Sequence, residues 1–258
     1  MNIHFTPEIG PQEGIIRPRR TKTDPPVDPD VILAFVKTDL DYLISLFPNQ
    51  KTQSYDQGFF RFFKLFFDHH AGLTLAGPML GAPQAVMVME KLIALGGRRF
   101  WALGWCGSLQ PEIKIGNFIV PTHAVCEEGT SAHYPIPQAN PETDPELGAR
   151  LVDTLRADRV AYYQGPVWTT DAPYRETPLK IKTYRQKENL AVEMEMSALI
   201  TLALFRAVKV AGLLVVSDEL AGLKWKPGFH SPALKNGSQL ACRSLLKAIG
   251  IPLALTRP

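Results

Sequence analysis

The stretch AVEMEMSALITLALFRAVKVAGLLVVSDEL, residues 191–220, decides how we expect the chain to fold. It opens with Glu193 and Glu195, each followed by a methionine, and closes with Asp218 after an apolar run. Burying a carboxylate is costly unless it is paired, neutral or bound to a ligand. Acids at the edges of buried elements therefore indicate a site, with solvated loop acids as the alternative. Between the acids, apolar spacing predicts a helix and then a buried strand, over 197–208 and 210–216.

Upstream of this stretch, predicted strands and helices alternate. A strand over 73–76 leads into the glycine turn GPMLGAP, and a helix over 84–95 follows it. A strand over 100–103 then leads into a second glycine turn, GWCGS. This alternation predicts an α/β fold with a largely parallel sheet. Elsewhere we predict a strand and helix within 31–47 with Thr38 or Asp39 as the N-cap, strands over 115–125 and 161–168, and helices over 145–157, 180–187 and 238–249.

The domain organisation follows from composition along the chain. Residues 1–29 are rich in Pro, Gly and Arg and show no periodicity, which predicts an extended N-terminal arm, mobile or laid on a neighbouring subunit. Residues 55–67 are dense in phenylalanine, which favours a buried strand or loop packing over a platform for stacking bases. Pro121 is expected to bend its strand or place it at a sheet edge. No linker separates two cores, so we predict a single α/β domain over 30–258.

Bulk composition excludes several classes of protein. The 258 residues are 45% hydrophobic and carry a net charge of +3, so neither nucleic acid nor a membrane is called for as a partner. The longest apolar runs are too short to span a bilayer, and no signal peptide is recognised. The three cysteines are widely spaced, which fits a reduced cytoplasm. No histidine pattern indicates a metal site.

The two glycine turns admit two interpretations. Backbone N–H groups at such turns cradle anions, but glycines also simply permit tight turns and close packing. Neither turn matches the Walker or the dinucleotide-binding pattern. Cys106, inside the second turn, is a candidate nucleophile, although a small buried thiol is the commoner role for a free cysteine.

Three blocks together resemble a known family: GPMLGAP with the later GWCGSLQPEIKIGNFIVP, then EEGTSAHYPIP, and finally VEMEMSALITLALFRAVKVAGLLVVSDEL. They are similar to the purine nucleoside and uridine phosphorylase superfamily, which includes the methylthioadenosine/adenosylhomocysteine nucleosidases. The resemblance covers about residues 73–249. It implies a single domain around a mixed, partly closed sheet, and a homo-oligomer, dimer or hexamer. It also implies a small-molecule nucleoside as the ligand.

The resemblance also assigns roles to the acids. Glu195, within Met194-Glu195, would bind the ribose hydroxyls, and Glu193 would assist at the sugar edge. Asp218 would donate a proton to a purine base, which requires a raised pKa. A hydrogen bond to the sugar 2-hydroxyl that tightens as the bond breaks helps such cleavage. Further substrate contacts would come from the second glycine segment and from the loop after the 161–168 strand: Trp105, Cys106, Gly107, Pro173, Tyr174 and Arg175.

The phosphate-binding part departs from the family pattern. Where phosphorolytic members carry an arginine and a Ser or Thr, this chain has Ala102 and Trp105. Gly81, Lys37 and Arg61 are the replacement candidates, because a phosphate dianion needs cationic or N–H partners. Three interpretations stay open: a phosphorylase with a rebuilt phosphate site, a hydrolase in which Trp105 fills the vacated space, and a non-catalytic nucleoside binder. No organic cofactor or metal is expected, and inorganic phosphate is the candidate co-substrate.

Overall fold

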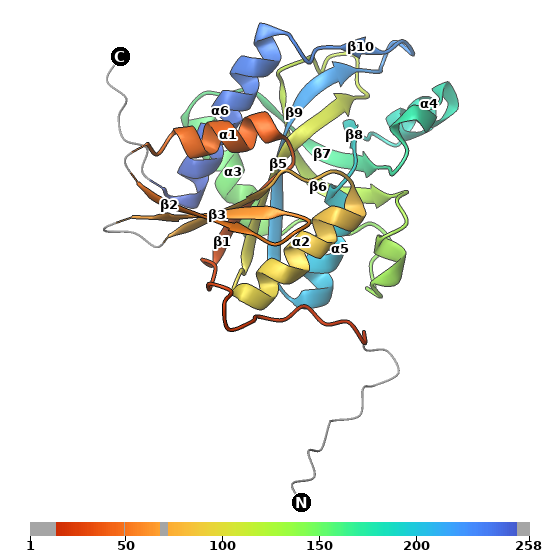
Figure 1. Ribbon diagram of the computed structural model, residues 1–258. Helices are drawn as coiled ribbons and strands as arrows, with labels where there is room; N and C mark the ends of the chain where they lie inside the picture. The colour runs from red at the N-terminus through yellow and green to blue at the C-terminus, as the bar shows by residue number, and fades with distance from the viewer. Residues whose placement is uncertain (1–13, 49, 68–71, 252–258) are drawn as a thin grey trace, which may run out of the picture.

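The computed structural model describes residues 14–48, 50–67 and 72–251 (Figure 1). The first part of the predicted arm, residues 1–13, lies outside the described residues. Within them, ten strands form one mixed sheet in the order β10-β9-β6-β7-β8-β5-β1-β4-β3-β2. Their bounds are β1 Asp30–Ala34, β2 Lys51–Asp56, β3 Arg61–Phe66, β4 Leu73–Gly77, β5 Arg99–Ser108, β6 Phe118–Cys126, β7 Tyr162–Thr169, β8 Ala191–Glu193, β9 Lys209–Glu219 and β10 Lys226–Pro227.

The sheet closes on itself around β5. This strand pairs in parallel with β9 and antiparallel with the short β8. β9 also pairs with β6, β6 with β7, and β7 with β8, so five strands form a closed ring. β1 and β4 continue from β5 as a parallel wing that ends in the β2–β3 hairpin. The partly closed mixed sheet that the resemblance implied is confirmed.

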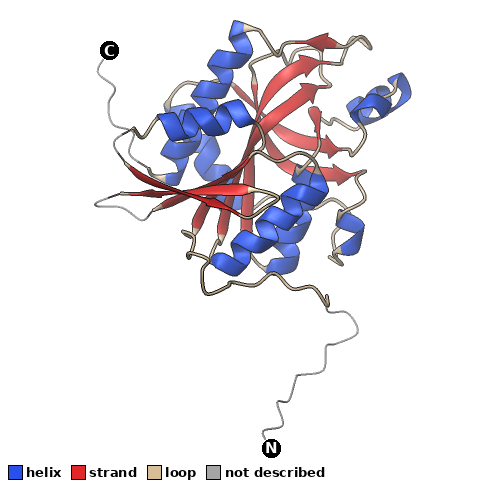
Figure 2. Cartoon of the chain, viewed as in Figure 1, coloured by secondary structure: helices blue, strands red, loops and turns tan. Residues whose placement is uncertain are grey.

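Helices cover both faces of the sheet (Figure 2). α2 (Ala82–Leu95) and α5 (Met196–Arg206) bury Met89 and Leu199 in one core cluster, which includes Cys106 of β5. α1 (Lys37–Ser45), α3 (Pro145–Ala157) and α6 (Pro232–Ile249) pack on a second cluster, against which Trp105 of β5 lies. α4 (Pro178–Gln186) covers a smaller third cluster. Neighbouring residues of β5 thus face different helical layers, as strand geometry requires.

Most predicted elements are present. The helix over 145–157 is α3, and the predicted strands over 73–76 and 161–168 are β4 and β7. The phenylalanine-rich segment is part of the β2–β3 hairpin, where Phe60 and Phe62 are buried. Pairing of β6 with β7 shifts register between Pro121 and Ala124, so the strand is irregular there, yet it lies inside the sheet rather than at an edge.

Two local predictions were wrong. The N-cap of α1 is Val36, and it makes no side-chain cap; Asp39 lies inside the helix and is buried. The segment 104–108 is not a turn, because β5 runs through it to Ser108. A Cβ at Gly104 would lie 2.3 Å from the Phe35 ring, so this glycine allows close packing within a strand. The first glycine turn is confirmed, with Gly81 at φ +82° as the N-cap of α2.

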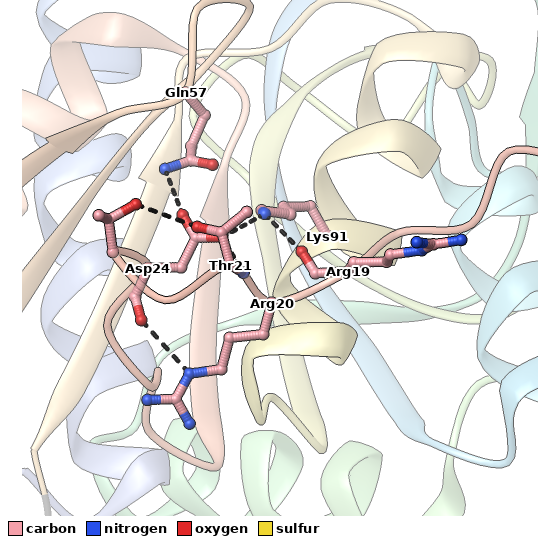
Figure 3. Close-up of polar contacts among 7 residues, drawn as sticks. Arg19, Arg20, Thr21, Asp24, Gln57 and Lys91 are labelled. Carbon is pink, nitrogen blue, oxygen red and sulfur yellow. Dashed lines mark hydrogen bonds and ion pairs between the residues drawn. The ribbon is translucent and has the colours of Figure 1, made fainter. Parts of the chain in front are cut away.

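The described part of the N-terminal arm lies on its own chain. Lys91 of α2 donates to the Arg19 carbonyl at 2.7 Å and to Asp24 Oδ2 at 2.6 Å (Figure 3). Gln57, in the turn between β2 and β3, contacts Asp24 Oδ1 at 3.4 Å. Hydrogen bonding to Lys91 lowers the pKa of Asp24 to about 2. The arm therefore connects α2 to the β2–β3 hairpin.

Candidate functional site

Glu193 ends β8 and fixes the start of α5. Its Oε2 accepts the backbone N–H groups of Glu195 and Met196, both at 2.7 Å, and its Oε1 accepts the Thr169 hydroxyl. Thr169 Oγ1 in turn accepts the N–H of Ser197 at 2.9 Å. The first N–H groups of a helix lack partners inside it and favour negative charge. Glu193 is therefore a buried carboxyl that organises the helix N-terminus.

Glu195 lies at the N-cap of α5 and reaches the N-terminus of α2. Its Oε1 accepts the Gly81 N–H at 2.6 Å, and its side chain is buried. Burial, followed by the charge of Glu193, raises the pKa of Glu195 to about 8. Burial also raises the pKa of Glu193, against the hydrogen bonds that lower it. The pair therefore retains a proton close to neutral pH, and it joins two helices that are distant in sequence.

A third carboxylate, Glu128, borders this pair. Its Oε1 accepts the Ser197 hydroxyl at 2.8 Å, and its Oε2 accepts the N–H groups of Thr130 and Ser131. The negative charge of Glu128 contributes to the raised pKa of Glu193. The acids around the α5 N-terminus thus share one buried network of hydroxyl and backbone donors.

Asp218, near the end of β9, is held by side chains instead. Its Oδ1 accepts the Ser217 hydroxyl at 2.7 Å, and its Oδ2 accepts the Trp225 indole N–H at 3.0 Å. Burial raises the pKa of Asp218, while these two hydrogen bonds lower it. Burial, the charge of Asp218 and that of Glu127 also raise the pKa of Glu176 to about 7. Asp218 is therefore a carboxyl whose protonated form is favoured by its surroundings.

Cys106 and Gly107 of β5 connect the two groups of acids. Gly107 pairs with Val192 of β8 on one side and with Asp218 of β9 on the other. A Cβ at Gly107 would lie 3.1 Å from Asp218 Oδ2 and 3.3 Å from Val192 Cγ1. Burial and the charges of Asp218 and Glu193 raise the pKa of the Cys106 thiol well above its usual value. A thiol that resists ionisation is a poor nucleophile, which argues against that role for Cys106.

The predicted base contacts lie in the 3₁₀ turn Pro173–Arg175. All three residues are exposed, and Tyr174 is 100% exposed. The structure thus leaves the Tyr174 ring in solvent and does not bring it onto the acids. Met194, between the two glutamates, is half-buried.

The candidate phosphate ligands are dispersed, and each has a partner in its own chain. The Gly81 N–H donates to Glu195. Lys37 pairs with Asp41 at 2.5 Å, and Arg61 pairs with Asp56 at 3.1 Å, with both cations exposed. No contact among the described residues brings any two of the three together. Ala102 is fully buried in the core.

Trp105 does not fill space beside the glutamates. Its indole N–H donates to Ser238 Oγ of α6 at 2.8 Å, and its ring lies 6.1 Å from that of Phe229. It packs against the core cluster of α1, α3 and α6, whereas Cys106 belongs to the cluster of α2 and α5. The expectation that Trp105 occupies the vacated part of the acid site therefore does not match its position.

Sequence reasoning missed several residues of the site. Thr169 and Ser197 bond to the buried glutamates, Trp225 holds Asp218, and Glu176 lies within electrostatic range of Asp218. Thr169 stands immediately after an apolar strand, which is the one signal that pointed to it. Trp225 lies seven residues beyond Asp218 in a polar loop, and no periodicity links the two.

The surface hollows do not coincide with the acids, and the described residues contain neither a metal-ligand cluster nor a membrane-spanning helix. Two hollows in the described surface lie between α3 and the end of α5, and between α1 and α6, and neither is lined by Glu193, Glu195 or Asp218. Among the described residues, no group of three or more His, Cys, Asp or Glu side chains is arranged to hold a metal ion. Nor does any helix in the described ranges have the length and apolarity to cross a membrane.

Comparison with known proteins agrees with this fold. Residues 29–249 match the sequence profile of the phosphorylase superfamily. Guanosine phosphorylase of Halorubrum lacusprofundi is 28% identical over 181 residues, which are 69% of this chain and 75% of that protein. Uridine phosphorylase of Thermococcus kodakarensis is 33% identical over 102 residues, which are 40% of this chain and 37% of that protein.

Solved structures show the same architecture. Uridine phosphorylase of Vibrio fischeri superposes with a TM-score of 0.77 over 88% of this chain and 93% of that one, at 24% identity. Purine nucleoside phosphorylase of Toxoplasma gondii, in complex with immucillin-H, gives 0.76 over 86% and 90%, at 22% identity. The profile match spans most of the chain, and the chain therefore belongs to the phosphorylase superfamily.

Proposed function

We propose that this protein cleaves the N-glycosidic bond of a purine nucleoside. Glu195 would accept hydrogen bonds from the ribose hydroxyls, and Asp218 would donate a proton to the leaving base. The observation that carries this proposal is that burial raises the pKa of both Glu195 and Asp218, while β8, two residues before Glu195, and β9, which holds Asp218, pair with Gly107 from its two sides. Catalytic acids are commonly tuned in this way by burial. The relative named for guanosine supports the choice of a purine base.

Each acid suits a different part of the substrate. A glycosidic bond breaks with positive charge developing on the sugar. The Glu193–Glu195 pair keeps one proton near neutral pH, and the single negative charge that remains on the pair would favour this transition state. The base leaves as an anion unless it is protonated, so a neutral Asp218 would lower the barrier. The buried Glu193 would hold Glu195 in place through the N–H groups at the start of α5. This division of work rests on the contacts above and on the family to which the chain belongs.

Inorganic phosphate is the nucleophile we propose first, because the superfamily is one of phosphorylases. A second candidate is water. The specific observation that favours it is that Gly81, Lys37 and Arg61 each already bind a carboxylate of the chain. A phosphate dianion would have to replace those partners.

The nucleophile and the substrate can be tested in one assay. The protein is incubated with inosine, guanosine, adenosine and uridine, with and without inorganic phosphate, and the products are separated chromatographically. Phosphate-dependent release of base with ribose 1-phosphate supports phosphorolysis, and free ribose supports hydrolysis. If no nucleoside in the panel releases base under either condition, the proposed function is wrong.

We also propose that the protein is a cytoplasmic homo-oligomer. Exposed apolar side chains on α2 and α5, namely Met87, Leu204 and Phe205, support self-association through these helices. The three cysteines are free, which fits a reducing compartment. Sedimentation of the purified protein would test the proposed self-association, and a monomer at micromolar concentration would contradict it.

A further inference from the structure

A hollow of about 570 Å³ lies between α1 and α6, on the face of β5 that Trp105 occupies. Its lining includes Asp39, Ser238 and Leu234, all buried, and the partly exposed rings of Tyr42, Trp105 and Phe229. We call it the Asp39 pocket. Cys106, next to Trp105 in β5, lies on the opposite face, in the core cluster to which α5 contributes Leu199. The lining of the Asp39 pocket includes none of Glu193, Glu195 and Asp218.

The chemistry of the Asp39 pocket is set by one carboxyl. Asp39 is only 2% exposed, and its Oδ2 has no hydrogen-bond partner among the described residues. Buried polar atoms are nearly always paired, and a buried carboxylate without a partner is especially costly. Burial raises the pKa of Asp39 to about 6. The described part of the protein thus leaves one oxygen of this buried carboxyl unsatisfied.

The walls of the pocket favour a flat, positively charged group. The Trp105 and Phe229 rings lie 6.1 Å apart at 26° to each other. Aromatic faces attract cations, and guanidinium-like or amidinium planes also stack on them. An N–H donor on such a cation would satisfy Asp39 Oδ2 with a charge-assisted hydrogen bond. Lys235 also lines the pocket, but its side chain is exposed at the rim.

We propose that the Asp39 pocket binds a small planar cation, an amidinium or a protonated aminoheterocycle, which donates an N–H to Asp39 Oδ2. This inference does not depend on the proposed nucleoside cleavage. It assigns a function to a buried acid that the proposed reaction does not use.

The test is calorimetric titration of the full-length protein at pH 7.5 with benzamidinium, and with benzoate as a probe of the same size and opposite charge. We expect benzamidinium to bind and benzoate not to bind. Equal binding of the two, or no binding of benzamidinium at millimolar concentration, would overturn the proposal. This comparison needs no variant, so it stands even if substitution of Asp39 impairs folding.

Variants then locate the bound cation. Asp39→Asn should weaken benzamidinium about ten-fold or more, as expected for loss of a hydrogen bond to a charged group. The control is Asp41→Asn, which removes an exposed carboxylate from the same helix and should leave the affinity unchanged. Glu195→Gln should also leave it unchanged. Weakening by Glu195→Gln but not by Asp39→Asn would place the cation among the glutamates and contradict the proposal.

Discussion

Glu195 is buried and Asp218 is half-buried, and both carboxyls have raised pKa values, yet the chain fixes them in different ways. Glu195 accepts a backbone N–H from the turn before α2, and its neighbour Glu193 binds two N–H groups at the start of α5. Asp218 is held by the hydroxyl of Ser217 and by the indole of Trp225, a residue that is 61% exposed. Backbone donors at helix ends are rigid, whereas a partner on an exposed loop can move away. The sugar end of the proposed site is therefore preset, and the base end is adjustable.

The largest effect should come from Asp218→Asn, because an amide cannot supply the proton that the leaving base needs. We expect kcat on a purine nucleoside to fall by roughly 10²–10⁴-fold, the usual contribution of a general acid. The melting temperature should change little, since the amide retains an acceptor for Trp225. The control is Glu219→Gln, the adjacent carboxylate that pairs with Lys114 and Lys226. Equal rates for Asp218→Asn and the wild type would remove Asp218 from the mechanism.

Glu195→Gln should have the next largest effect and should depend on the sugar. Its oxygen can still accept the Gly81 N–H, but the amide cannot share a proton with Glu193, so the negative charge of the pair no longer extends to the ribose. We expect kcat/KM to fall about 10–100-fold on a ribonucleoside, as for a lost hydrogen bond to a charged group. The 2′-deoxyribonucleoside of the same base should be affected less. Steady-state kinetics on the ribonucleoside and its 2′-deoxy counterpart test this difference. Equal losses of kcat/KM on the two substrates would mean that Glu195 does not contact the 2′-hydroxyl.

The buried glutamates also predict how stability depends on pH. The pKa of Glu195 rises from 4.5 to about 8 on folding, so the folded protein keeps a proton that the unfolded chain releases. Stability should therefore decrease as the pH rises from about 5 to 8, since the folded state binds more protons over that range. Glu195→Gln should flatten this decrease, and Glu112→Gln, at an exposed position, should not. Chemical denaturation across this pH range measures the free energy of unfolding. If this free energy falls with pH equally in the wild type and in Glu195→Gln, the prediction is contradicted.

Trp225→Phe should have the smallest effect on the rate, because it changes only a hydrogen bond to Asp218, at the base end of the proposed site. Loss of the indole N–H removes a hydrogen bond that lowers the pKa of Asp218, so this pKa should rise. If protonated Asp218 is the acid, the alkaline limb of the pH–rate profile then moves to higher pH, while the rate at the optimum changes only a few-fold, about the worth of one hydrogen bond. Lys224→Gln, one residue away and exposed, is the control. An alkaline limb that stays in place would show that Trp225 does not tune Asp218.

Much of this arrangement could be predicted from the sequence, because it depends on local patterns. The apolar spacing located α5 and β9, and hence put the three acids at their ends. The glycine turn GPMLGAP indicated the start of α2, whose N-cap, Gly81, donates its N–H to Glu195. These features are encoded within a few residues of each other.

The rest depends on contacts between distant segments. Gly104 reads as a turn residue until Phe35, which directly follows β1, is seen to cover it. Asp39 reads as a helix cap, yet α6, some two hundred residues later, buries it beneath Ser238. The resemblance assigns Trp105 to the site because it stands where family members carry a phosphate-binding Ser or Thr, but strand alternation directs its side chain to the face opposite that of Cys106. Each of these errors comes from packing partners that no local pattern specifies.

The central claim is that Glu195 and Asp218 act on one bound nucleoside from its two ends. A crystal structure of the protein with an uncleavable purine nucleoside analogue tests it most directly. We expect the Glu195 carboxylate within hydrogen-bond distance of the ribose hydroxyls and the Asp218 carboxyl within hydrogen-bond distance of the base. An analogue bound elsewhere, or one that contacts only one of the two acids, would contradict the account.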